Sequence, residues 1–248
     1  MSSNLTYLKE TDFENTIAVA GLPGIALIGK MAVEYLIQDL EAEKFAELTS
    51  DKFPGWAIRE NGIIRDLKIY FHKANIENLD RELILITADA QASSSPGQHE
   101  LSQEIVEMLS NQGVETIVTM AAFLDSEEKK SPIVGAGTDT ETVKMLKDHD
   151  VGILEGGRIV GMNGLLVTMG AERGMNGFCL LGTTEGKDND PEASKNVLSK
   201  FSEIFDLNLD ISDFDEKVPD LPKFKPPEIK MPSGSKKKMG KRDLSYIR

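Results

Sequence analysis

Short, continuous apolar runs alternate along this chain with longer stretches in which apolar residues recur every three or four positions. The continuous runs are typical of strands covered on both faces of a sheet, and they lie at residues 16–20, 83–87, 115–121 and 177–181. The periodic stretches predict amphipathic helices, at residues 25–40, 98–110, 140–148, 163–173 and 191–205.

Weaker strand signals fill the gaps between these elements, at residues 44–50, 56–58, 63–64, 67–71 and 132–137. The tripeptide Glu60-Asn61-Gly62 is a turn signal and predicts a local antiparallel meander beside the main sheet. A further hairpin or turn is expected at residues 152–161. The order of the elements predicts a mixed α/β fold, with a mostly parallel sheet sandwiched by helices.

A serine cluster precedes the second predicted helix. Ser95 suits the N-cap position, Pro96 the first helical residue and Gln98 the capping-box partner. Capping therefore accounts for the serines without any catalytic role.

The last 34 residues differ in composition from the first 214. Residues 215–248 contain five prolines and ten Lys or Arg against five Asp or Glu, a net charge of +5. Because the whole chain carries −13, residues 1–214 carry −18. So polar and proline-rich a segment does not fold alone. We therefore predict an α/β domain at residues 1–214 and a flexible basic tail at residues 215–248.

The tail ends in a small apolar cluster that suits a docking tip. Leu244, Tyr246 and Ile247 lie just before the terminal Arg248. A solvated segment that finishes in an aromatic and a β-branched residue indicates binding to a partner protein. A terminus without any partner is the plainer interpretation.

Composition argues against secreted, membrane-spanning and nucleic-acid-binding proteins. The first residues show no signal peptide, and the longest apolar candidate, at residues 25–37, is interrupted by Lys30 and Glu34. Cys179 is the one cysteine and lies in an apolar run, as expected of a core residue in a reducing cytoplasm. The acidic body argues against nucleic acid, although the lysines of the tail leave that alternative open.

One motif suggests phosphate binding. The segment from Gly24 to Lys30 fits the start of a phosphate-binding loop, G-x-x-x-x-G-K, and Asp89 could then serve as the acidic residue near magnesium. Met31 occupies the position where that loop has Ser or Thr, and the residues between the glycines fit the buried face of a helix that has already begun. A nucleoside- or phosphate-binding protein, or an enzyme using the turn from Gly21 to Lys30, remains the alternative hypothesis.

Other chemical constellations are weaker. Ser93, Ser94 or Ser95 with His99 and Asp89 would make a nucleophile, base and orienting acid, but sequence proximity says little about such geometry. The three histidines are isolated from one another, so no metal site is predicted and no cofactor is expected.

A succession of short motifs resembles the proteasome assembly chaperone 2 family, including its archaeal members. The matching segments are AGLPGIA at residues 20–26 with Gly29, Phe53-Pro54, LITADAQ at 85–91, GGRIVGMNGLL at 156–166 and DPEAS at 190–194. They follow the family's order over about residues 10–210.

The resemblance implies an α/β fold akin to nucleoside phosphorylases, without established catalysis and usually found as a homo-oligomer. It implies a chaperone of proteasome α-subunits, or an activator that inserts C-terminal tails between the α-subunits of the core particle. Those tails end in a hydrophobic residue, tyrosine and any residue, with the free carboxylate paired to a pocket lysine. Here Tyr246 stands at the hydrophobic position and Ile247 at the tyrosine position.

The leading hypothesis is therefore a non-enzymatic, ATP-independent chaperone or activator, docking through Leu244, Tyr246, Ile247 and Arg248. A homo-oligomer in the cytoplasm is expected, with no membrane partner. The apolar face of the helix at residues 25–40 is one candidate for the oligomer interface.

Overall fold

The computed structural model describes residues 3–76, 81–124, 131–186, 188–219 and 221. Within these residues a nine-stranded sheet has the order β1-β3-β6-β7-β2-β8-β11-β9-β10. The four neighbours β7, β2, β8 and β11 run parallel at its centre, and antiparallel pairs join β1, β3, β6 and β7. The bounds are β1 Ser3–Tyr7, β2 Thr16–Gly21, β3 Glu43–Ser50, β6 Ile69–Ile76, β7 Arg81–Ala88, β8 Thr116–Leu124, β9 Ile133–Gly137, β10 Gly152–Ile153 and β11 Asn176–Thr184.

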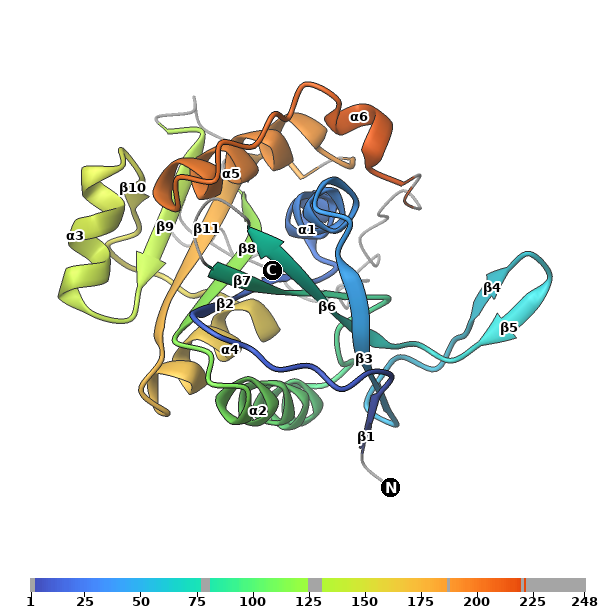
Figure 1. Ribbon diagram of the computed structural model, residues 1–248. Coiled ribbons are helices and arrows are strands. Elements are labelled where there is room, and N and C mark those ends of the chain that lie inside the picture. Colours follow the sequence, from blue (N-terminus) through green and yellow to red (C-terminus); the bar gives the residue numbers. More distant parts are fainter. Residues whose placement is uncertain (1–2, 77–80, 125–130, 187, 220, 222–248) are drawn as a thin grey trace, which may run out of the picture.

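Helices cover both faces of the sheet (Figure 1), which confirms the predicted fold class. One face packs against α1 (Ile28–Asp39) and α5 (Pro191–Ile204), the other against α2 (Ser95–Asn111) and α4 (Met162–Ala171). The short α3 (Thr140–Asp148) packs on β9 and β10 at one edge. Each face of the sheet has its own hydrophobic core. Alternate residues of β2 belong to these two cores, with Val19 facing α1 and Ala20 facing α2 and α4. The central strands are therefore apolar on both faces, which is why the sequence showed them as continuous runs.

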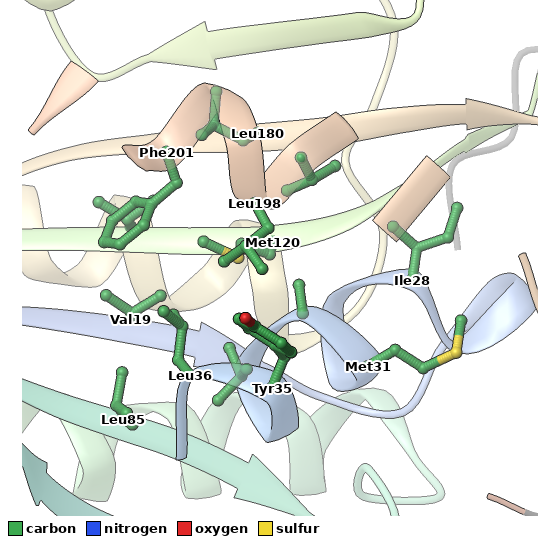
Figure 2. Packing of buried hydrophobic residues seen from close by; sticks show 14 of the residues in the cluster. Val19, Ile28, Met31, Tyr35, Leu36, Leu85, Met120, Leu180, Leu198 and Phe201 are labelled. Carbon is green, nitrogen blue, oxygen red and sulfur yellow. The ribbon is translucent and has the colours of Figure 1, made fainter. Parts of the chain in front are cut away.

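Helix α1 lies unusually close to the sheet because two glycines allow it. A Cβ atom on Gly29 would lie 1.8 Å from the backbone oxygen of Met120, and one on Gly21 would lie 2.0 Å from the oxygen of Gly29. Any side chain at either position would push α1 off the sheet. Figure 2 shows how Tyr35 and Leu36 of α1 then pack among side chains from the sheet and α5.

Strands β4 (Ile58–Glu60) and β5 (Ile63–Arg65) form a separate two-stranded hairpin that projects from the body (Figure 1). We call residues 58–65 the arm. Asn61 and Gly62 both have positive φ, 50° and 81°, as a two-residue hairpin turn requires. The predicted turn is thus confirmed, although the strand expected at residues 56–58 begins only at Ile58.

Several local predictions were wrong. Helix α1 begins at Ile28, not at residue 25, because Ala26 and Leu27 adopt left-handed φ values of 53° and 52°. The N-cap of α2 is Ser94, whose Oγ accepts from the Gly97 amide, so the cap lies one residue before the expected Ser95. Gln98 donates to the Ala92 oxygen instead of completing a capping box.

The apolar face of α1 does not form an external surface. It packs against the sheet, α5 and the short helix α6 (Phe214–Lys217). The suggestion that this face forms an oligomer interface is therefore wrong.

Candidate docking site

The predicted docking residues Leu244, Tyr246, Ile247 and Arg248 lie outside the described residues. What the structure describes is the segment that leads to them. Helix α6 spans the predicted boundary between residues 214 and 215, so the folded chain continues at least to Lys217. The division into a body and a tail stays a prediction.

Helix α6 is fixed to α1 by an aromatic pair. Phe214 is 1% exposed, and its ring stacks on Tyr35 with the centroids 5.2 Å apart. The Tyr35 hydroxyl lies 2.6 Å from the main-chain oxygen of Asp210 and 2.8 Å from a carboxylate oxygen of Asp213. Burial, and then the hydrogen bond to Asp213, raises the pKa of Tyr35, so the hydroxyl keeps its proton and serves as a donor.

Ion pairs surround this aromatic pair. The Lys217 ammonium lies 2.6 Å from the Asp39 carboxylate of α1 and 2.8 Å from Asp213. Hydrogen bonds from Lys217 and then from Tyr35 lower the pKa of Asp213. Lys195 of α5 pairs with Asp215 at 2.7 Å. We call Tyr35, Asp39, Asp213, Phe214 and Lys217 the latch. It fixes where the chain leaves the body toward its C-terminus.

The turn from Gly21 to Lys30 offers little to a phosphate. Lys30, the presumed phosphate-binding residue, has its ammonium 2.7 Å from Glu34, 3.2 Å from the Thr87 hydroxyl and 3.0 Å from the Ala88 oxygen. A salt bridge this well buried would have to break before Lys30 could bind an anion. Ala26 and Leu27 interrupt the predicted helix with left-handed backbone angles, and α1 begins only at Ile28, two residues before Lys30.

Gln91 occupies the carboxyl edge of the central strands, where ligands of open α/β sheets usually bind. Its amide nitrogen donates to the Pro23 oxygen at 2.8 Å, and its amide oxygen accepts from the Met162 amide at 2.9 Å. It thereby joins the turn after β2 to the first amide of α4. Sequence reasoning included Gln91 only as the last residue of the LITADAQ segment and gave it no role; its position just after a buried strand was the available signal.

Of the residues of the imagined catalytic triad, Asp89, Ser93 and Ser94 have other partners, and Ser95 and His99 are exposed. The Asp89 carboxylate accepts two hydrogen bonds from Arg65, at 2.6 and 3.2 Å, and one from the Tyr70 hydroxyl at 3.0 Å. Ser94 caps α2, and Ser93 donates to the Lys52 oxygen. These contacts hold the arm and a helix end in place.

Within the described residues, no three His, Cys, Asp or Glu side chains are grouped so that they could hold a metal ion. None of the helices described there is both long and apolar enough to cross a membrane.

Three known proteins show what the chain is similar to. Pyrococcus furiosus PbaB, described as an archaeal proteasome activator, has a crystal structure that superposes with a TM-score of 0.80 and 33% identity, covering 88% of this chain and 94% of PbaB. Pyrococcus furiosus PbaA, described as an archaeal homologue of proteasome-assembly chaperone, gives a TM-score of 0.73 and 26% identity over 88% of this chain and 87% of PbaA. The uncharacterized protein MJ1210 of Methanocaldococcus jannaschii is 31% identical over 245 residues, 94% of this chain and 93% of that protein.

The model of the PAC2 family matches residues 18–220, from β2 through α6. This match includes both helical layers and the latch, and it confirms the resemblance drawn from the short motifs. The chain belongs to the PAC2 family.

Proposed function

We propose that this chain is a non-enzymatic, ATP-independent chaperone or activator that binds proteasome α-subunits through its C-terminal tail. The observation that carries the proposal is its likeness to PbaB over nearly the whole length of both chains. The target is the α-subunit surface, either during ring assembly or on the core particle. The setting we expect is the cytoplasm.

The latch supports a docking tail because it gives the tail a fixed origin. About 27 residues follow Leu221, the last described residue, and a flexible chain of that length has a root-mean-square reach of roughly 30 Å. The tip would thus search a limited volume around the body. Several tails on one homo-oligomer would then bind with an avidity far above that of one tail.

The residues at the end of the tail would make the contacts with the α-subunits. Tyr246 and Ile247 would bury their side chains in a groove between α-subunits, and the carboxylate of Arg248 would pair with a lysine there. Ile247 lacks the hydroxyl of the tyrosine that the family's tails carry at this position. We therefore propose docking on the α-subunits and assign no opening of the core particle's gate.

Co-migration with purified α-subunits on a native gel tests this proposal. The full chain should bind, and a chain that lacks Tyr246 to Arg248 should lose at least about tenfold in affinity, since aromatic anchors and terminal charges dominate such contacts. A chain with one glycine added after Arg248 should lose a similar amount because its carboxylate is displaced. The matched control, Ser245→Ala, should bind as the wild type does.

The results of this experiment distinguish the possible binding sites. Binding that survives both the truncation and the added glycine would move the site onto the folded body. No binding by any form at tens of micromolar would exclude α-subunits as the target.

A further inference from the structure

Three large apolar side chains are exposed in the segment between β3 and β6, in the arm and at its root. Trp56 is 52% exposed, and Ile63 and Ile64 in the arm are 70% and 74% exposed. Tyr7 and Leu8 are also about half exposed, but they lie at the other end of β1, because Tyr7 pairs with Ala46 whereas Ser3, beside the root of the arm, pairs with Ser50. Three large apolar groups exposed in one short segment indicate a surface that another protein covers.

Each face of the arm carries one strongly exposed isoleucine opposite a charged residue. In its ladder Glu60 pairs with Ile63 and Arg59 with Ile64. Side chains alternate between the faces of a hairpin, so Ile63 points to one side and Ile64 to the other. A flat partner surface would cover only one of them, and the tip therefore fits a cleft.

The arm is held in place although it has no core of its own. A lone two-stranded hairpin is marginally stable in water. Arg65, at the end of β5, makes its two-pronged contact with Asp89 at the end of β7, and its guanidinium lies 5.8 Å from the Tyr70 ring centre. The body therefore sets the direction in which the arm points.

A cavity of about 660 Å³ opens at the root of the arm. Its apolar wall comes from Phe53, Pro54, Trp56 and Leu67, and its rim carries the acidic Asp51 and Asp66. We call it the root cavity. It combines an apolar floor with negative charge, whereas the arm presents isoleucines beside the exposed Arg59.

We propose that the occupant of the root cavity is the arm of a second copy of this chain. Two identical arms laid antiparallel place each tip at the other's root, so one two-fold axis satisfies both contacts. Ile63 and Ile64 enter the cavity from the tip. Arg59, on the same face as Ile64, meets Asp66, since the Asp51 carboxylate already lies 3.2 Å from the Lys52 ammonium.

This contact goes beyond the proposed function, because it concerns self-association and leaves the C-terminal tail unused. If the arm contact fails, a single tail can still dock, with the lower avidity of a monomer, and the failure of tail docking would leave the arm contact intact. The two proposals are tested on different variants.

Sedimentation velocity of the full chain at about 100 µM gives the first test. The wild type should associate, and Ile63→Asp with Ile64→Asp should weaken association at least about tenfold, because the tip is the proposed anchor. Both residues lie outside the core, so the thermal midpoint should stay unchanged. The matched control, Val160→Asp, alters a residue that is 37% exposed and belongs neither to the arm nor to the lining of the root cavity, and it should associate as the wild type does.

A mixed cross-link tests the partner site itself. Ile64→Cys on the tip and Ala57→Cys at the root cavity are prepared as separate proteins, each with its native Cys179 buried. Oxidation of the mixture should give a disulfide-linked pair that neither protein forms alone in comparable yield. Arg59→Glu should weaken association, and Asp66→Arg should restore it in the double variant.

Three results would overturn the proposal. One is a wild type that stays monomeric at 100 µM, and another is association that the arm substitutions leave intact. The third is an arm variant that still self-associates but no longer binds α-subunits, which would assign the arm to that partner.

Discussion

The Tyr35 hydroxyl lies 2.6 Å from the main-chain oxygen of Asp210, a residue 175 positions further along the chain. The contact joins the first helix of the fold to the last segment before α6. It means that the origin of the tail depends on a residue near the start of the sequence.

Replacing Tyr35 by Phe should loosen this junction without disturbing the stack on Phe214. The variant leaves the Asp210 oxygen and Asp213 without their hydroxyl donor, so we expect a loss of about 1–2 kcal/mol in the free energy of unfolding. Urea unfolding measures the loss, and amide hydrogen exchange in α6 should quicken. Tyr7→Phe, at a half-exposed ring, is the control and should change stability by less than about 0.5 kcal/mol. Equal effects of both substitutions would contradict the assigned contact.

His72 should make the fold sensitive to acid. Burial lowers its pKa from 6.5 to about 4; Glu34 opposes this shift, and Lys44 and Lys30 add to it. Its Nδ1 atom is buried without a hydrogen-bond partner. Because the unfolded chain binds the proton more readily, stability should be full above pH 6.5 and fall as the pH drops toward 4, by at most about 3 kcal/mol.

The measurement is the free energy of unfolding between pH 7 and pH 4. His72→Gln should have a flatter profile than the wild type, whereas His99→Gln, at an exposed site, should keep the wild-type slope. Parallel profiles for all three proteins would show that His72 is not the group responsible.

Gly29→Ala should be among the most damaging single-methyl changes in the protein. The added Cβ would meet the Met120 oxygen at 1.8 Å, and the three nearest atoms are all backbone atoms of β8, so no flexible side chain can move aside. We expect a loss of about 3 kcal/mol or more. Gly55→Ala is the matched control, because nothing lies within 4 Å of its Cβ position. Thermal denaturation of the two variants compares them, and similar midpoints would contradict the close approach of α1 to β8.

Arg65→Lys should release the arm while leaving the charge in place. Lysine cannot make the two-pronged contact with Asp89. We expect amide exchange in β4 and β5 to quicken about tenfold, with little change in global stability. Arg59→Lys, in the exposed part of the arm, should leave the exchange unchanged. An arm that stays equally protected in both variants would contradict the role given to Arg65.

The sheet could be predicted largely because its central strands are buried on both faces. The runs that became β7, β8 and β11 are apolar over consecutive positions, and such a signal needs no knowledge of neighbours. By contrast, β1 has a mixed pattern, and its pairing with β3 is what makes it a strand. Residues 214–217 form a helix in a setting provided by Tyr35 and Lys195.

The candidate site, like the sheet, could be predicted from the sequence only in part. Local composition predicted the tail and its tip. The tip lies outside the described residues, and both stay predictions. The predicted start of α1 was wrong because Ala26 and Leu27 adopt a left-handed backbone conformation, which such residues disfavour. Distant contacts maintain it, among them the bond from the Asp190 amide to the Ala26 oxygen. The role of Gln91 likewise depends on Met162, 71 residues away, which no local pattern shows.

The arm sits between β3 and β6, and these two strands pair with each other whatever the loop between them contains. Its length and sequence can therefore change in evolution without altering the register of the sheet. Under the two proposals made above, insertions in the arm would change self-association and substitutions at residues 244–248 would change the target, separately from each other.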